Sequence, residues 1–337
     1  MREKIIIYGA GRIGKKALYC LKDDYDVMFF IDSDESKWGT YVDNLIINPP
    51  SILSNYCNTR LVIASSYFEE ILKNINIYSI KNVDIFQVIM DRHISENIIE
   101  QLDKRTINLG CFFGNNNSML CKELTFLAGG SGVLDYFFLK QLAIRFNCAY
   151  YLEIGTYIGE SINILSDVCK KLYSITAPLD APYSMNNWCK KYKMPDYSER
   201  LAYSPKITHY YTDSKEFDYS KIPDDIDLYF IDGDHSYAGV YSDTKNIFKK
   251  KKKNAIIVWH DFKKQRNTYN VEVVQAVYDV LGEDFSNVYV TDNNICGVYI
   301  PDEYKDEFEL CENKYETDRP LYVYDTELKV HIIDGIY

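Results

Sequence analysis

Three acidic residues and a histidine lie at the ends of two apolar runs in the second half of the chain. Asp232, Asp234 and His235 follow the first run, and Asp261 follows the second. Such runs are typical of buried strands, and parallel strands end at one edge of a sheet, where ligands bind. Carboxylates gathered there repel one another unless a proton or cation intervenes. We therefore expect Asp232 and Asp261 to hold Mg²⁺ or another divalent cation, the alternative being a helix cap and a loop anchor.

His235, three residues after Asp232, is the candidate general base of this group. A histidine titrates near neutrality, so it can take a proton from a hydroxyl while a group is transferred to that hydroxyl. His260, directly before Asp261, is the rival candidate. Side chains alternate along a strand, so His260 should point away from Asp261. We therefore expect His235 and Asp232 to be the catalytic residues.

A second segment, about eighty residues earlier, has the glycine spacing of a ligand-binding turn. Residues 151–159 read Tyr-Leu-Glu-Ile-Gly-Thr-Tyr-Ile-Gly, a buried strand that stops at a turn and then enters a helix. Gly155 and Gly159 would let the backbone approach a ligand closely. The N–H groups at the start of a helix near Ile158 would suit a carboxylate. The alternative is a turn whose glycines serve packing alone.

The order of the expected elements predicts an α/β protein with two mostly parallel sheets. We expect a small Rossmann-like βαβ domain at residues 1–90 and a connector of helix and loop, a candidate acceptor lid, at 91–132. Residues 93–104 read as a helix and residues 108–118 as a loop. A larger sheet at 133–300 and an acidic tail with a hairpin at 301–337 complete the chain. The larger sheet should contain strands at 149–154, 172–175, 206–211, 227–231, 254–259, 287–290 and 297–300, with an antiparallel hairpin formed by the last two.

Residues 125–300 resemble the class I S-adenosylmethionine-dependent methyltransferases, in the small-molecule group with an Ile-Asp-Gly-Asp-His-Ser-Tyr signature. The resemblance rests on residues 151–161, 230–237 and 256–262 and on the terminal hairpin. It implies S-adenosylmethionine as the cofactor, with the methionine portion in the turn after the first strand and Asp213 near the adenine. The cofactor-binding residues that it implies are Glu153, Gly155, Thr156, Gly159, Ser161, Asp213 and Asp232.

One position departs from the pattern of this family. Its members usually end the second strand with an acid that binds the ribose hydroxyls, whereas Thr176 stands there in this chain and Asp180 follows four residues later. Related sugar and catechol-type O-methyltransferases bind a metal at the ends of the later strands. The resemblance therefore also implies Asp232 and Asp261 as metal ligands and His235 as the base.

The first domain carries a glycine pattern of its own. Gly9, Gly11 and Gly14 stand between a strand and a helix, and Asp32 ends the next strand, which completes a dinucleotide-binding fingerprint. About ninety residues are only half of a full dinucleotide-binding fold. On residues 29–34, 49–50 and 62–67 the domain resembles Rossmann-like domains that precede acyltransferase and methyltransferase modules of bacterial surface-sugar pathways. That resemblance implies a nucleotide-sugar or a related ligand, and the alternative is a domain that only packs or dimerises.

The charge and the cysteine content of the chain indicate which binding partners and which cellular compartment to expect. The net charge of −11 argues against nucleic acid as the main partner. No apolar run approaches the roughly 20 residues that span a bilayer, and the amino terminus reads as a strand rather than as a signal peptide. The nine cysteines form no Cys-x-x-Cys pair, which favours free thiols in a reducing cytoplasm.

These features predict a cytoplasmic S-adenosylmethionine-dependent methyltransferase. The expected acceptor is a hydroxyl of a sugar or nucleotide-sugar in bacterial glycan biosynthesis, and a homo-oligomer is compatible with this reading. One alternative is an N-methyltransferase for an amino sugar or amino acid, which would need no metal. Two others are an NAD-dependent oxidoreductase that uses the first domain and a non-catalytic nucleotide-sugar-binding protein.

Overall fold

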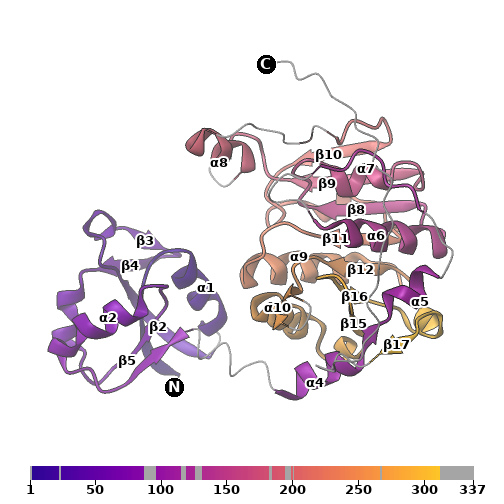
Figure 1. Cartoon of the computed structure of the whole chain (residues 1–337). Helices are drawn as coiled ribbons and strands as arrows, with labels where there is room; N and C mark the ends of the chain where they lie inside the picture. Colours follow the sequence, from indigo (N-terminus) through magenta and orange to yellow (C-terminus); the bar gives the residue numbers. More distant parts are fainter. Residues whose placement is uncertain are drawn as a thin grey trace.

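The structure is a computed structural model, and its described residues form two α/β domains (Figure 1). Among these residues, no helix combines the length and the apolar character needed to cross a membrane. The expected fold class is confirmed: a mostly parallel sheet with an antiparallel hairpin follows a smaller Rossmann-like domain. The described ranges are 2–22, 24–86, 96–114, 119–125, 131–181, 184–193, 199, 201–265 and 268–311.

The smaller domain is built on a six-stranded sheet with the order β3-β4-β2-β1-β5-β6. Strands β4, β2, β1, β5 and β6 pair in parallel, and β3 pairs with β4 in a hairpin that the sequence analysis did not anticipate. Its helices and strands are β1 (Glu3–Tyr8), α1 (Arg12–Leu21), β2 (Tyr25–Ile31), β3 (Tyr41–Val42), β4 (Leu45–Asn48), β5 (Arg60–Ile63), α2 (Phe68–Ile75) and β6 (Val83–Ile85).

The larger domain is built on a nine-stranded sheet with the order β10-β9-β8-β11-β12-β16-β15-β7-β17. Strands β10, β9, β8, β11 and β12 are parallel, and β15 and β16 form the expected antiparallel hairpin. Its strands are β7 (Thr106–Ile107), β8 (Tyr150–Ile154), β9 (Lys171–Thr176), β10 (Ile207–Tyr211), β11 (Leu228–Ile231), β12 (Ile256–Trp259), β15 (Val288–Thr291), β16 (Gly297–Tyr299) and β17 (Leu310–Cys311), and a separate pair is β13 (Lys263–Gln265) with β14 (Thr268–Tyr269).

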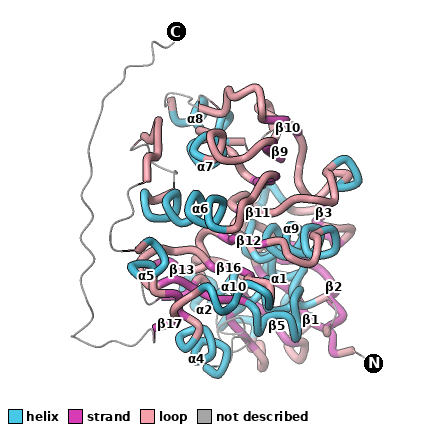
Figure 2. Tube along the Cα trace, turned by 90° about the vertical axis from the view of Figure 1, so that its right-hand side faces the viewer, coloured by secondary structure: helices cyan, strands magenta, loops and turns pink. Residues whose placement is uncertain are grey.

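The helices of the larger domain lie on both faces of its sheet. Figure 2 shows α5, α6 and α7 following one another along one face. Helices α9 and α10 lie on the other face, between the sheet and the smaller domain (Figure 1). The bounds are α4 (Glu96–Lys104), α5 (Leu109–Phe113), α6 (Val133–Arg145), α7 (Glu160–Ile164), α8 (Met185–Tyr192), α9 (Tyr237–Lys250) and α10 (Val271–Leu281).

The connector differs from its expected form at two places. Strand β7 joins the larger sheet between β15 and β17, although the connector was expected to be helix and loop. The loop prediction for residues 108–118 is wrong over α5, because the side chain of Asn108 accepts a hydrogen bond from the Cys111 amide and so starts a helix. Residues 115–118, and the tail hairpin expected beyond residue 311, lie outside the described ranges.

Helix α1 docks the smaller domain onto the larger one. Tyr19 packs with its ring centroid 5.9 Å from that of Tyr237 and 5.5 Å from that of Tyr241, both on α9. Lys16 is buried and forms an ion pair with Glu272 of α10, with its Nζ atom 2.5 Å from Oε1. One apolar core accordingly runs from β1 through α1 to α9 and α10. The two domains therefore share a packed interface, and the amino-terminal end of α1 has a fixed place against the larger sheet.

Candidate active site

A cavity of about 1170 Å³ lies beyond the carboxyl ends of four parallel strands. Its walls include the turns that follow β8, β9, β10 and β11, together with Ala10, Gly11, Arg12 and Lys15 of the smaller domain. Ligands of open α/β sheets bind at this edge. The volume exceeds the roughly 300–1,000 Å³ of a pocket for one drug-sized molecule, so a cofactor and a second ligand can share it.

The turn after β8 lines this cavity, but its glycines are explained by contacts within the protein. Gly155 has a φ of 91°, and a Cβ there would lie 2.2 Å from the carbonyl oxygen of Asp232. Gly159 has a φ of 92°, and a Cβ there would lie 2.6 Å from the Cβ of Ala202. Gly155 is required so that the turn after β8 can approach the turn after β11, and Gly159 so that it can approach Ala202, in the segment before β10. The packing explanation therefore accounts for these two glycines, while their backbone still faces the cavity.

Glu153, the last acid of β8, is fully buried behind the cavity wall. Its Oε2 atom accepts hydrogen bonds from Tyr151 (2.9 Å) and from Ser161 (2.8 Å), and Ser161 lines the cavity. Burial raises the pKa of Glu153 to about 7, although these hydrogen bonds favour its ionised form. Glu153 can therefore change its charge close to neutral pH.

The helix that follows the turn begins at Glu160, two residues after the expected start near Ile158, and brings its own carboxylate. α7 has five residues, and its first residue, Glu160, is buried and accepts a hydrogen bond of 2.6 Å from Tyr136 of α6. That carboxylate stands at the end of the helix where a ligand carboxylate was expected. Tyr136 and Ser131 also line the cavity. Ser131 belongs to the connector 91–132, the candidate acceptor lid, whereas no sequence pattern marked Tyr136 of α6.

Two further predicted cofactor residues, Thr156 and Asp213, line the cavity, and so does Thr176 at the end of β9. The Asp213 carboxylate accepts a hydrogen bond from the Lys215 amide (2.9 Å), which holds the turn after β10. Among the described residues that form the cavity wall, Asp180 is absent. Asp180, the first acid after Thr176, is thus not part of the described wall, and Thr176 occupies the strand end where the family pattern has an acid.

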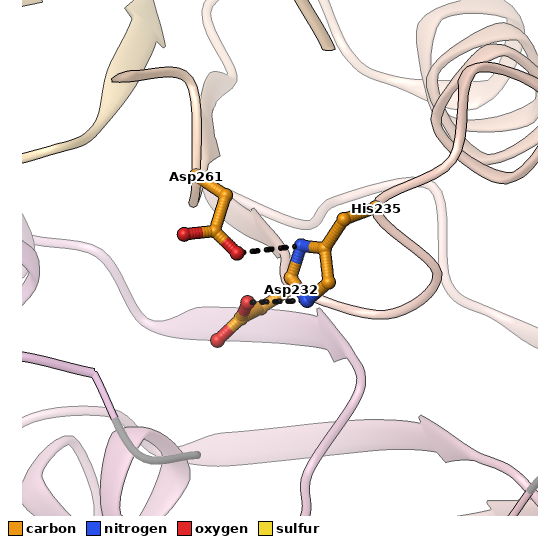
Figure 3. A group of neighbouring side chains, drawn as sticks. All are labelled: Asp232, His235 and Asp261. Carbon is orange, nitrogen blue, oxygen red and sulfur yellow. Dashed lines mark ion pairs between the residues drawn. The ribbon is translucent and has the colours of Figure 1, made fainter. Parts of the chain in front are cut away.

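Asp232, His235 and Asp261 come together at the rim, as the sequence predicted (Figure 3). The His235 Nδ1 atom lies 2.9 Å from Asp261 Oδ2, and its Nε2 atom lies 3.8 Å from Asp232 Oδ1. One ligand atom from each of the three residues lies within 4.8 Å of the others. Asp234 turns to Lys215 instead, with 3.5 Å between the carboxylate and Nζ. Two carboxylates and one imidazole at this spacing fit a divalent cation.

The two carboxylates control the charge of His235. Burial alone would lower the pKa of His235, but the hydrogen bond to Asp261 and the charges of Asp232 and Asp261 outweigh burial and raise it. Burial alone would likewise raise the pKa of Asp261, but contact with His235 and the nearby His260 lowers it. The ion-free cluster therefore favours a protonated imidazole beside ionised carboxylates.

His260 also belongs to this cluster, so the expectation that it points away from Asp261 is wrong. Its Nδ1 atom lies 3.1 Å from Asp232 Oδ1 and 3.6 Å from Asp261 Oδ1, and its Nε2 atom lies 3.4 Å from the buried carboxylate of Asp135. Strand β12 ends at Trp259, and Asp261 has a left-handed φ of 51°. Strand alternation therefore does not extend to these two residues. His260 itself is buried behind the rim.

Of the four residues expected to bind a ligand in the smaller domain, Gly11 reaches the cavity wall. A Cβ at Gly14 would lie 1.7 Å from the Gly9 carbonyl oxygen, so these glycines serve packing of α1 on β1. Asp32 accepts hydrogen bonds from the Ala10 amide (2.8 Å) and from Lys37 Nζ (3.1 Å). The Asp32 carboxylate thus braces the glycine turn. A ligand role for Asp32 stays a prediction.

Two family models match separate parts of the chain. Residues 152–262 match a model described as "Methyltransferase domain", and residues 1–86 match one described as "C2185-like, N-terminal". An uncharacterized protein of Acanthamoeba polyphaga mimivirus is 28% identical over 155 residues, which are 44% of this chain and 68% of that protein.

Solved structures similar to this chain include two methyltransferases. The O-methyltransferase NovP has a TM-score of 0.40 at 12% identity, over 50% of this chain and 80% of its own. CalS11, a TDP-rhamnose 3′-O-methyltransferase of calicheamicin biosynthesis, has a TM-score of 0.36 at 12% identity, over 50% and 77% of the two chains.

The Asp261→Asn substitution should lower the pKa of His235 towards its ordinary value. The change removes a charge that raises this pKa and weakens the hydrogen bond that favours the imidazolium. NMR titration of the ion-free, histidine-labelled protein measures the shift. His209, whose Nε2 atom lies 3.0 Å from the Ala202 carbonyl oxygen, is the internal control. An unchanged pKa of His235 would show that Asp261 does not hold the imidazole in solution.

Proposed function

We propose that this protein, in which residues 152–262 form an S-adenosylmethionine-dependent methyltransferase domain, transfers a methyl group to a hydroxyl of a sugar or nucleotide-sugar. The pair of His235 and Asp261 carries this proposal, with 2.9 Å between Nδ1 and Oδ2 at the edge of the cavity. A hydroxyl must lose its proton when it is methylated, and an imidazole on the cavity wall can take that proton. The reaction belongs to carbohydrate biosynthesis.

The polarity of the cavity wall supports a hydroxyl-rich acceptor. Near His235, the wall offers hydroxyl, amide and carboxyl groups that can pair with several sugar hydroxyls. The cofactor's place would be along the turns after β8 and β10, whose residues the family resemblance assigns to it. The acceptor would then lie between these turns and the first turn of α1. The polar residues of this part of the wall are Ser131, Asp234, Ser236, Asn270 and Glu272.

The atoms of His235 fit the role of base. With Nδ1–H donating to Asp261, the neutral ring carries its lone pair on Nε2. The acceptor oxygen would lose its proton to Nε2 as it forms a bond with the methyl carbon. The carbon–sulfur bond of the cofactor would break at the same time, and S-adenosylhomocysteine would leave. Asp261 would hold the ring in place and stabilise the imidazolium that forms.

The carboxylates of Asp232 and Asp261 are the ligands that we propose for a divalent cation. Both reach the rim, and both lie within 4.8 Å of an imidazole nitrogen of His235. A bound cation would lower the pKa of an acceptor hydroxyl and offset the negative charge that holds His235 protonated. The chain's own residues would still bind, orient and deprotonate the acceptor.

The Glu153→Gln substitution should weaken binding of S-adenosylmethionine several-fold at pH 8, because it removes a negative charge that lies behind the cavity wall. We propose that this charge favours the cofactor's ammonium group through Ser161, which lines the cavity and donates to Glu153. Because the pKa of Glu153 is about 7, wild-type affinity should rise from pH 6 to pH 8. The variant should lose this dependence, as isothermal titration calorimetry can measure. A wild-type affinity that is flat over this range would contradict the role of Glu153.

The His235→Gln substitution should lower kcat about 10²- to 10⁴-fold, the range for loss of a general base, without changing affinity for S-adenosylhomocysteine. Transfer of tritiated methyl groups to a panel of nucleotide-sugars measures the rate. His209→Gln is the matched control, because His209 lies in β10 and is absent from the described wall of the cavity. Equal rates for the two variants would remove His235 from the reaction.

Chelation with EDTA and the Asp261→Asn substitution should each abolish binding of Mn²⁺ and lower the rate of methyl transfer. Electron paramagnetic resonance of added Mn²⁺ reports the binding directly. Asp234→Asn is the control for binding, because Asp234 pairs with Lys215 outside the cluster. Full activity in EDTA together with full activity of Asp261→Asn would favour N-methylation without a metal.

A further inference from the structure

We propose that the acceptor carries a phosphate or diphosphate group, and that Arg12 and Lys15 of the smaller domain bind this group in the cavity where methyl transfer occurs. Both residues line that cavity together with His235 and the turn after β8. The inference rests on the proposed function, because it assigns the anionic part of the same acceptor. The two domains would then form one composite active site.

The docking of α1 brings these cations to the site. Lys16 pairs with Glu272, and the Glu272 carboxylate also accepts a hydrogen bond of 3.3 Å from the Tyr237 amide, two residues after His235. Arg12 lies one turn of α1 before Lys16, and Lys15 is adjacent to it. The contacts that dock the domain therefore place Arg12 and Lys15 next to the segment that carries His235.

The cations in this part of the cavity are available to a ligand. Arg12 and Lys15 are exposed, and no ion pair or hydrogen bond engages their side chains among the described residues. Lys264, after β12, lines the same cavity and is likewise exposed and unpaired within the described ranges. By contrast, Lys16, Lys37 and Lys215 each have an acidic partner. Three cations that line one cavity of an acidic protein, unpaired within the described residues, favour an anion there.

Gly11 leaves the start of α1 open at the cavity wall. A Cβ at Gly11 would meet no atom within 4 Å, and its φ of −81° is open to any residue. Neither packing nor backbone conformation therefore explains the glycine, in contrast to Gly9 and Gly14. Gly11 is the N-cap of α1, and no side chain caps this helix within the described residues. A missing side chain on the cavity wall leaves the first amides of the helix open to a phosphate oxygen.

A phosphate fits these groups better than an uncharged ligand does. Arginine pairs with phosphate through two parallel hydrogen bonds, lysine adds a point charge, and helix amides donate to the remaining oxygens. The cavity volume allows a phosphate at α1 and a hydroxyl at His235 in one molecule beside the cofactor. A sugar phosphate and a nucleotide-linked sugar share this chemistry.

Calorimetric titration with inorganic pyrophosphate, in the presence of saturating S-adenosylhomocysteine, tests the inference. We expect the wild-type protein to bind pyrophosphate and the Arg12→Ala/Lys15→Ala double variant to bind it at least tenfold more weakly. Lys73→Ala is the matched control, because Lys73 is an exposed lysine of α2 that is absent from the described cavity wall. Parallel titrations with uridine diphosphate and a sugar 1-phosphate would distinguish the two carriers.

The Gly11→Ala variant separates a ligand effect from a folding effect. It should keep the thermal unfolding midpoint within a few degrees of wild type, since its Cβ meets no neighbour, yet bind pyrophosphate several-fold more weakly. The affinity for S-adenosylhomocysteine should be unchanged in every variant.

The inference would be wrong if the wild-type protein did not bind pyrophosphate, or if the double variant bound it equally well. It would also be wrong if the double variant lost affinity for S-adenosylhomocysteine in parallel, because the cations would then bind the cofactor. If the protein binds S-adenosylhomocysteine but not pyrophosphate, the phosphate site is wrong and the proposed methyl transfer is unaffected. A wild-type protein that does not bind S-adenosylhomocysteine overturns the proposed function instead.

Discussion

Repulsion between carboxylates at the rim of the larger sheet is the constraint on which the site depends. Strands β11 and β12 are parallel neighbours paired from Leu228 with Ile256 to Ile231 with Trp259, so the acids that follow them must converge. Two imidazoles lie between these acids: His235 contacts Asp261, and His260 lies between Asp232 and the buried Asp135. The histidines offset the repulsion. The same arrangement leaves one face of the cluster open to the cavity.

The site also depends on α1, because this helix packs against both domains. One side of this helix packs on β1 and β2 through the glycine turn, and another side packs on α9 and α10 through Tyr19 and Lys16. Helix α9 begins two residues after His235, and Glu272 near the start of α10 joins Lys16 to the Tyr237 amide. Packing between the domains is thus connected directly to the segment that carries the proposed base. A cavity with walls from both domains is a consequence of this docking.

Most strands of the larger sheet could be predicted from the sequence, because a hydrophobic run and the turn residues that bound it lie next to each other in the chain. The strands β8 to β12 were predicted within two residues, and their parallel order made the convergence of Asp232 and Asp261 predictable. Strand β7 could not be predicted, since two residues have no periodicity and only pairing with β15 and β17 makes them a strand. The orientation of His260 was missed because it depends on a left-handed residue, Asp261, directly after it.

The sequence could not show which atoms the glycines and the first helix would contact. Both glycine segments were predicted to bind a ligand, with packing as the alternative, and Gly9, Gly14, Gly155 and Gly159 are each required by a neighbouring atom of the protein. The spacing of glycines in a sequence does not show whether a glycine makes room for a ligand or for a neighbouring segment of the protein. The docking of α1 had no sequence signal either, because Tyr19 and Tyr237 are more than two hundred residues apart and meet only in the folded chain.

The distribution of charge in the cavity gives a physical reason for a composite site. A protein with a net charge of −11 repels an anionic substrate at long range, and the rim carboxylates add to that repulsion where the reaction would occur. Cations close to the anionic group offset this repulsion, provided that they do not pair with Asp232 or Asp261. In the larger domain, Lys215 pairs with Asp234, and Lys264 in β13 is an unpaired cation of the wall within the described ranges. Arg12 and Lys15 come from a different domain, whose own contacts fix their position and keep them separate from the rim. A molecule that is anionic at one end and carries hydroxyls at the other would be oriented by this separation before any methyl transfer.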